Sequence, residues 1–225
     1  MQTISFSQSK TQQLEDLFNV KRSLNIKELE NLLAINQGEI PTENNVFFTN
    51  LSEIAFLNID SWTEQELIMK HISQIIHLVK YSYIDYNTFA DRPFSYKFDK
   101  LKLSGSMDFL IAGGRSEPKA PYFCLHEYKK EQNFEADPKG KLLAEMLVAQ
   151  ALNRDAKTGF ETIYGCYIVG RNWFWVILKD KEYAVSRAYD STRIGDLSEI
   201  YLILIKIKYI IEDHIAAQKL KNEKF

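Results

Sequence analysis

Two acids and a lysine in neighbouring apolar segments are the residues of this sequence best suited to chemistry. Asp108 lies within the apolar run 101–111, and Glu127 and Lys129 lie near the end of the run 121–130. Magnesium takes one or two carboxylates from a protein and completes its shell with waters and phosphate oxygens. Asp108 and Glu127 would supply those carboxylates, while Lys129 would orient or help deprotonate a metal-bound water and neutralise charge at a scissile phosphate. The set therefore predicts a Mg²⁺ or Mn²⁺ site for phosphodiester hydrolysis.

The periodicity of the two runs indicates how they position these side chains. In the first run, alternate residues such as Leu103 and Met107 share one face of a strand, and Asp108 lies on the other. In the second run the same period places Glu127 and Lys129 on one face together with apolar residues. Glycine and proline between the runs favour a turn, so we expect two adjacent strands.

A further acid opens the helix that is predicted before these strands. The sequence Ser61-Trp-Thr-Glu64 has the form of a capping box, and apolar residues recur after it at helical spacing. This spacing aligns Glu64 with Ile68 and turns Glu66 toward the polar side of the helix. The Glu64 carboxylate is therefore expected at the start of the buried face.

The segment after the second strand predicts a helix with an amide on its apolar stripe. The pair Asp137-Pro138 suits the start of this helix, which is expected to continue through residue 153. Lys139 and Lys141 in its first turns would meet either phosphate or solvent. The stripe extends to Gln150, and an amide in that position needs a hydrogen-bonding partner.

The order of these residues resembles a known family. Gly105-Ser-Met-Asp108, followed by Glu127-Tyr-Lys129, is similar to the motif of the PD-(D/E)XK nuclease superfamily, with Met107 where the eponymous proline would be. The resemblance covers residues 61–190, and the apolar strands within it look like those of the nuclease domains of type I restriction subunits. It implies a restriction-endonuclease-like fold, a magnesium site at Asp108 and Glu127, and cleavage of nucleic acid, DNA more than RNA.

The same resemblance implies roles for two residues outside the strands. In this superfamily a helix before the first core strand often contributes one more acid, and Glu64 is in the matching place, with Glu66 as a weaker substitute; Glu64 would otherwise only cap its helix. In part of the superfamily a glutamine on the later helix touches the site or the substrate, and Gln150 resembles it. Arg154 stands where a tyrosine would complete that motif, so a core or interface amide is the alternative for Gln150.

Composition sets limits on partners and compartment. The chain has 225 residues and a net charge of -2, so attraction to nucleic acid must come from local patches rather than from the whole field of the protein. Cys124 and Cys166 lie in apolar runs, which favours reduced core thiols. Neither a secretory leader nor a membrane span is predicted, so the expectation is a cytoplasmic protein without a membrane partner.

The coarse order of elements predicts an α/β fold with a mixed β-sheet flanked by helices. Residues 1–60 are expected to form a helical N-terminal extension and residues 61–225 the nuclease-like domain. Apolar runs at 162–169 and 173–178 predict two further strands joined by a tight turn. The helix at 196–221 has too many apolar residues for one stripe, so it either crosses the middle of the fold or forms a homodimer.

A second functional class fits the same sequence. A protein with this fold but without catalysis would serve as an interaction or regulatory module, with the C-terminal helix as its interface. The net negative charge and the missing tyrosine favour this alternative. The head-group distances among Asp108, Glu127 and Lys129 are the observation that most directly separates the two classes.

Overall fold

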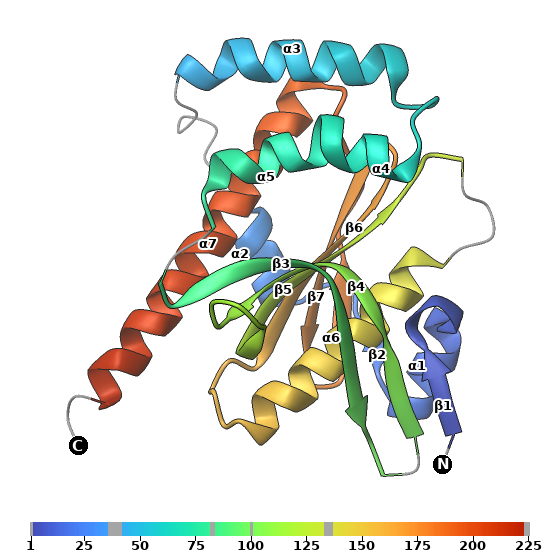
Figure 1. Ribbon diagram of the computed structural model, residues 1–225, viewed down its shortest axis with the longest axis vertical. Helices are drawn as coiled ribbons and strands as arrows, with labels where there is room; N and C mark the ends of the chain where they lie inside the picture. The colour runs from blue at the N-terminus through green and yellow to red at the C-terminus, as the bar shows by residue number, and fades with distance from the viewer. Residues whose placement is uncertain (1, 36–41, 82–83, 100, 133–136, 223–225) are drawn as a thin grey trace.

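The computed structural model describes residues 2–35, 42–81, 84–99, 101–132 and 137–222. Within them, nine strands form one mixed β-sheet with helices on its faces, so the fold is α/β (Figure 1). The strands follow the order β1-β4-β5-β6-β7-β8-β2, with β3 beside β4 and β9 beside β7. They are β1 (Gln2–Ser5), β2 (Lys21–Arg22), β3 (Tyr86–Lys97), β4 (Leu101–Gly113), β5 (Lys119–Lys129), β6 (Thr162–Val169), β7 (Asn172–Lys179), β8 (Glu182–Val185) and β9 (Tyr189–Asp190).

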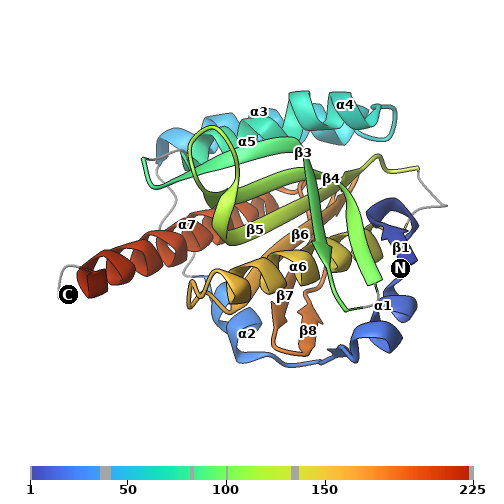
Figure 2. The same cartoon turned by 60° about the horizontal axis from the view of Figure 1, so that its bottom comes forward.

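The helices lie on both sides of this sheet. Figure 2 shows α3, α4 and α5 above the strands and α6 below them. A π-helical turn, Ile68–Ile72, joins α4 to α5. The helices are α1 (Thr11–Phe18), α2 (Lys27–Leu33), α3 (Thr42–Asn58), α4 (Glu64–Leu67), α5 (Ser73–Val79), α6 (Pro138–Asp155) and α7 (Ile194–Asn222).

The two strands that were expected to carry the site are neighbours in the sheet. β4 and β5 pair antiparallel, with Phe109 opposite His126 and Leu110 opposite Leu125. β5 pairs on its other side with β6 in the parallel direction, and β6 forms the expected hairpin with β7. The mixed sheet, the order of these four strands and helix α6 after β5 confirm the coarse prediction of fold class.

Strand β3 was not predicted, although it forms a long antiparallel hairpin with β4. Only Tyr86, Phe89 and Phe94 of its twelve residues are buried, at spacings of three and five. The period of two that indicates a strand in a sequence is therefore absent from this segment.

The described N-terminal residues contain three α-helices, but they also contain two strands that the prediction of a helical extension did not include. β1 pairs parallel with β4, and β2 pairs parallel with β8. The ring of Phe6 lies so close to Gly105 that a Cβ on this glycine would be 2.7 Å from the Phe6 Cδ2 atom. The glycine that opens the site motif is therefore required for packing against the N-terminal segment.

Helix α7 buries its apolar residues inside the chain. Ile200, Ile203, Ile207 and Ile211 are fully buried, and the helix packs against α2, α3, α5 and β9. Because several elements surround it, the helix needs more than one apolar stripe, which agrees with the first of the two alternatives for 196–221. The homodimer stays a prediction. None of the described helices has both the length and the apolar character needed to cross a membrane.

Candidate active site

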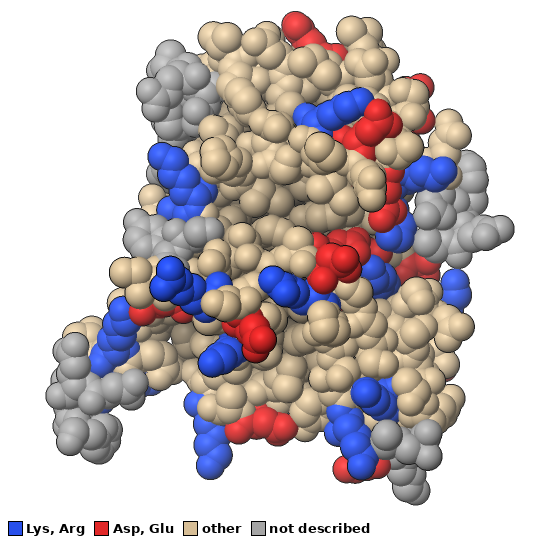
Figure 3. Space-filling model, in the orientation of Figure 1, with Lys and Arg blue, Asp and Glu red and all other residues tan. Residues whose placement is uncertain are grey.

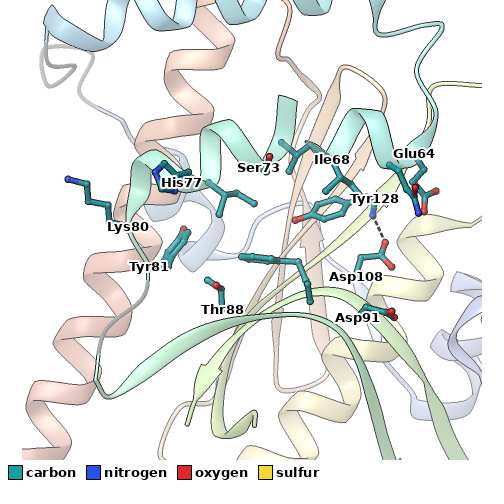
Figure 4. Close-up of a pocket in the computed structure, with 15 residues that line it drawn as sticks. Glu64, Ile68, Ser73, His77, Lys80, Tyr81, Thr88, Asp91, Asp108 and Tyr128 are labelled. Carbon is teal, nitrogen blue, oxygen red and sulfur yellow. Dashed lines mark hydrogen bonds between the residues drawn. The ribbon is translucent and has the colours of Figure 1, made fainter. Parts of the chain in front are cut away.

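Asp108 and Glu127 lie side by side at one end of the paired strands. Phe109 is opposite His126 and Leu110 is opposite Leu125. One residue further along each strand, Asp108 is therefore opposite Glu127, and their side chains lie on the same face of the sheet. The Tyr128 amide donates a hydrogen bond of 2.9 Å to the Asp108 Oδ2 atom (Figure 4). This bond holds the Asp108 carboxylate toward β5, so two residues that are 19 positions apart in the chain share one site.

Lys129 joins the acids through its ammonium group. Its Nζ atom is 2.8 Å from Glu127 Oε1, 3.3 Å from Glu64 Oε2 and 4.0 Å from Asp108 Oδ2. It also donates a hydrogen bond of 2.7 Å to the Tyr128 carbonyl. The head groups of Asp108, Glu127 and Lys129 therefore converge, which is the geometry that the nuclease hypothesis requires.

Glu64 reaches this cluster because another acid caps its helix. The capping box consists of Thr63 and Glu66: the Glu66 amide donates to Thr63 Oγ1, and the Thr63 amide donates to a Glu66 carboxylate oxygen. The prediction of a capping box at Ser61 and Glu64 is thus wrong by two residues. Glu64 occupies the first position of α4, where its half-exposed side chain contacts Lys129.

Two residues of α6 belong to the cluster: Glu145, which the sequence did not indicate, and Lys141, which was expected to meet phosphate or solvent rather than the acids. Lys141 Nζ lies 2.5 Å from Glu127 Oε2, 2.9 Å from Asp108 Oδ1 and 3.9 Å from Glu145 Oε1. Glu145 is fully buried. A lysine near a helix start is usually solvated, which concealed Lys141. The available signal was a lysine and a glutamate four residues apart on a helix whose neighbouring residues are apolar.

The pKa values of the two strand acids shift in opposite directions. Burial raises the pKa of Glu127 to about 7, and the charge of Asp108 adds to this effect, although Lys141 and Lys129 oppose it. Burial acts on Asp108 in the same sense, but Lys141 and the Tyr128 amide outweigh it and lower the pKa of Asp108 below its usual value. Near neutral pH, Asp108 is therefore ionised while Glu127 exchanges a proton.

The two lysines stay charged, and the helix acid stays protonated. Burial would lower the pKa values of Lys129 and Lys141, but the surrounding carboxylates raise both. Burial, together with the charge of Glu127, raises the pKa of Glu145 well above its ordinary range. The cluster thus contains two ammonium groups that keep their protons. It also contains two acids, Glu127 and Glu145, whose ionised forms a further positive charge would stabilise.

Carboxylate oxygens in the cluster are available to a metal ion. In the described part of the chain, no hydrogen bond of ordinary geometry reaches either oxygen of Glu127 or of Glu145, although lysine ammonium groups lie at ion-pair distance. Hard oxygen donors of this kind suit Mg²⁺ or Mn²⁺. As they stand, no three His, Cys, Asp or Glu side chains among the described residues are grouped as a metal would need. Asp108 and Glu127 fit the ion as a pair.

A groove of about 820 Å³ begins at this cluster and runs beneath the helices that precede β3. Figure 4 shows Glu64 and Asp108 at one end of the groove and His77, Lys80 and Tyr81 at the other. Its apolar wall comes from the α4–α5 segment on one side and from the strands on the other. The cluster is therefore reached from an open groove. The full lining is Glu64, Gln65, Ile68, Ile72, Ser73, Ile76, His77, Lys80, Tyr81, Thr88, Ala90, Asp91, Asp108, Phe109 and Tyr128.

Gln150 lies away from the cluster. In the orientation that satisfies both polar atoms of its amide, it donates to the Asp180 carbonyl and accepts from the Asp180 amide, each at 3.2 Å. Asp180 follows the end of β7 that pairs with Thr162, whereas Lys129 lies beside Val169 at the opposite end of β6. The predicted site role of Gln150 is therefore not supported, and the alternative of a buried amide satisfied by backbone describes its place.

Comparison of the chain with known protein families gives no matching family, and comparison with curated proteins gives no matching relative. The geometry of the cluster and of the groove beside it is therefore the basis for proposing a function.

Proposed function

We propose that this chain is a metal-dependent nuclease that hydrolyses phosphodiester bonds of nucleic acid, with DNA preferred to RNA. The observation that carries the proposal is the convergence of Asp108, Glu127 and the Lys129 ammonium group, with Asp108 lining one end of a groove. Two acids and a cation in this arrangement suit the binding of a divalent ion and the stabilisation of a phosphoryl transition state.

Each residue of the cluster has a role that follows from its surroundings. Asp108 and Glu127 would hold Mg²⁺ or Mn²⁺, which when bound would polarise the phosphate and lower the pKa of a coordinated water. Lys129 keeps its proton, because the acids around it raise its pKa. It therefore acts through its positive charge on the scissile phosphate rather than as a general base. Glu64 positions this ammonium group from the side of the groove.

The groove offers a path for substrate to the cluster. Figure 3 shows Lys and Arg atoms scattered over this face and interspersed with Asp and Glu atoms, without one continuous basic patch. With a net charge of -2, the protein has no global field that favours polyanions. Local contacts with phosphate, including the one at Lys129, would therefore provide most of the attraction to nucleic acid, and binding should weaken as salt increases.

A non-catalytic interaction or regulatory module is the second candidate, and one observation favours it. The ammonium group of Lys141 already bridges Asp108 and Glu127, at 2.9 Å and 2.5 Å. A cluster in which lysines permanently neutralise the acids would be structural, and it would bind no divalent ion. Metal binding by the purified protein separates this candidate from the nuclease.

The proposal is tested by incubating the purified chain with duplex DNA, single-stranded DNA and RNA in the presence of Mg²⁺ or Mn²⁺. We expect cleavage that requires the metal and that Asp108→Asn and Lys129→Met abolish. Asp91→Asn is the matched control, because Asp91 also lines the groove but accepts its hydrogen bond from Ser106 outside the cluster. Cleavage that survives in Asp108→Asn would show that the site is elsewhere or that the activity comes from a contaminant.

A further inference from the structure

Lys141 occupies the position at which three carboxylates from different elements meet. Its Nζ atom is within 4 Å of oxygens of Asp108 on β4, Glu127 on β5 and Glu145 on α6. The negative charge that attracts an ammonium group to this position would also attract a metal ion placed there. The three acids therefore already surround a cation, and that cation is a side chain of the protein.

Burial makes this arrangement costly unless a cation is present. Glu127 and Glu145 are fully buried, and none of their four oxygens receives a hydrogen bond of ordinary geometry from the described residues. The Glu127 oxygens are compensated by ammonium groups at 2.8 Å and 2.5 Å, but the buried Glu145 carboxyl group has no such close partner among the described residues, which is rare. Glu145 is directed at the same centre, because its Oε1 atom lies 3.9 Å from Lys141 Nζ.

The lysine is suited to leave this position. Its ammonium group is a point charge on a flexible four-carbon stem, and 14% of the side chain is exposed to solvent. A divalent ion placed among the same oxygens would repel the ammonium group and replace its contacts. Lys129 and Lys141 already share Asp108 and Glu127, so a divalent ion would be a third cation among these acids, and Lys141, which is nearest to all three of them, is the one it would displace.

We propose that Lys141 is the resident cation of a site formed by the carboxyl groups of Asp108, Glu127 and Glu145, and that a divalent ion binds by displacing its ammonium group and releasing the Glu145 proton to solvent. The identity of the ion, Mg²⁺ or Mn²⁺, rests on the proposed function. Displacement would free Lys141 to pair with a substrate phosphate near the site. The inference therefore adds Glu145 as a metal ligand and Lys141 as the residue that controls metal occupancy.

Calorimetric titration of the full chain with Mn²⁺ alone tests the proposal. We expect Lys141→Met to bind Mn²⁺ about tenfold more tightly than the unmodified protein, the effect of removing one competing charge-assisted hydrogen bond. Glu145→Gln should bind about tenfold more weakly. Lys139→Met is the matched control, a nearby lysine on the same helix outside the cluster, and its affinity should not change. Equal affinity in Lys141→Met and the unmodified protein, or no binding by either, would overturn the inference.

Thermal denaturation shows whether the variants fold and gives a second readout. Lys141→Met should melt at a lower temperature than the unmodified protein without metal, and Mn²⁺ should raise its melting temperature more. A Mn²⁺ shift no larger in Lys141→Met than in the unmodified protein contradicts competition.

A crystal structure with Mn²⁺ examines the displacement directly. The expected result is an ion among the three carboxylates with the Lys141 ammonium group moved away; an ion bound while Lys141 keeps its three contacts would refute the proposal. The nuclease proposal is judged separately by cleavage. Tighter Mn²⁺ binding by Lys141→Met without any cleavage would support this inference and reject the nuclease. Metal-dependent cleavage by the unmodified protein, with unchanged Mn²⁺ affinity in Lys141→Met, would support the nuclease and reject the displacement of Lys141.

Discussion

The two ends of helix α6 both bury polar side chains, but only one end satisfies them. Near its C-terminus, Asn153 accepts a hydrogen bond of 2.7 Å from the Tyr122 amide and donates to the carbonyls of Tyr122 and Phe160 at 2.8 Å and 3.2 Å. Nearer its N-terminus, the buried carboxylate of Glu145 accepts no hydrogen bond of ordinary geometry from the described residues. The same helix therefore supports the fold at one end and contributes to the candidate site at the other.

This difference distinguishes buried polar side chains that support the fold from those that could bind a ligand. An amide that is paired with backbone on all sides stabilises its neighbours and leaves nothing to bind a ligand. A buried carboxyl group such as that of Glu145, whose nearest described cation is 3.9 Å away, costs stability and leaves oxygen atoms able to bind a ligand. Substitutions at the two ends of α6 should accordingly affect different properties.

The largest effect is expected from Glu127→Gln, on β5, whose side chain meets Lys141 near the N-terminus of α6. The amide keeps the shape of the side chain but cannot supply an anionic ligand, so metal-dependent cleavage should fall by about 10²–10³-fold. The melting temperature without metal should stay the same or rise at pH 8, because the raised pKa shows that the ionised acid is disfavoured in the fold. If Glu127→Gln lost stability but kept its cleavage rate, Glu127 would support the fold rather than the site.

At the satisfied end, Asn153→Ala should have the opposite profile. It leaves the buried polar groups of Tyr122 and one of Phe160 without partners, so unfolding free energy should fall by roughly 2–4 kcal/mol. Cleavage per folded molecule should be unchanged. Urea denaturation and cleavage at a temperature where the variant remains folded measure the two quantities. A selective loss of cleavage would assign this end of the helix to the site.

The pH dependence of metal binding sharpens the distinction through Glu127. Its pKa of about 7 means that Mn²⁺ must displace a proton below neutral pH. We expect Mn²⁺ affinity to fall by up to about tenfold per pH unit below pH 7 and to level off above it. Calorimetry in buffers of different ionisation enthalpy would detect the released proton, and Glu127→Gln should not release it.

The same group sets a pH dependence of stability with a defined sign. The folded pKa of Glu127 is raised from an unfolded value of 4.5 to about 7, so its contribution is fully present below pH 4.5. That contribution declines as pH rises through this window and is lost above pH 7. Without metal, the free energy of unfolding of the unmodified protein should therefore fall relative to that of Glu127→Gln as the pH rises from 4.5 to 7. A flat difference would mean that the acid ionises normally.

The smallest effect is expected at Glu64, on the edge of the cluster. Its side chain is 40% exposed and contacts only Lys129 among the cluster residues, so Glu64→Gln should lower cleavage a few-fold, roughly the value of one exposed ion pair. Glu66→Gln is the matched control on the same helix, because a glutamine can still complete the capping box and the side chain lies outside the cluster, so cleavage should not change. Equal cleavage in both variants would remove Glu64 from the site.

Some features of this protein follow from local sequence patterns. Period-two alternation predicted the strands that carry Asp108 and Glu127, and Asp137 was correctly expected as the N-cap of α6, where it accepts a hydrogen bond from the Gly140 amide. Both signals are short in range, because they depend on the geometry of one strand or one helical turn. Strand β3 has no such signal, since its pairing with β4 rather than its own pattern keeps it extended.

The sequence by itself determined that two acids and a lysine lie on adjacent strands, because strand period and chain order are encoded locally. Only the tertiary structure decided which other side chains meet them. It brought Lys141 and Glu145 to the acids from α6, placed Glu64 against Lys129, and directed Gln150 to the opposite end of the sheet. These choices depend on how a helix is rotated and seated on the sheet, which packing of the whole core sets and no single segment encodes.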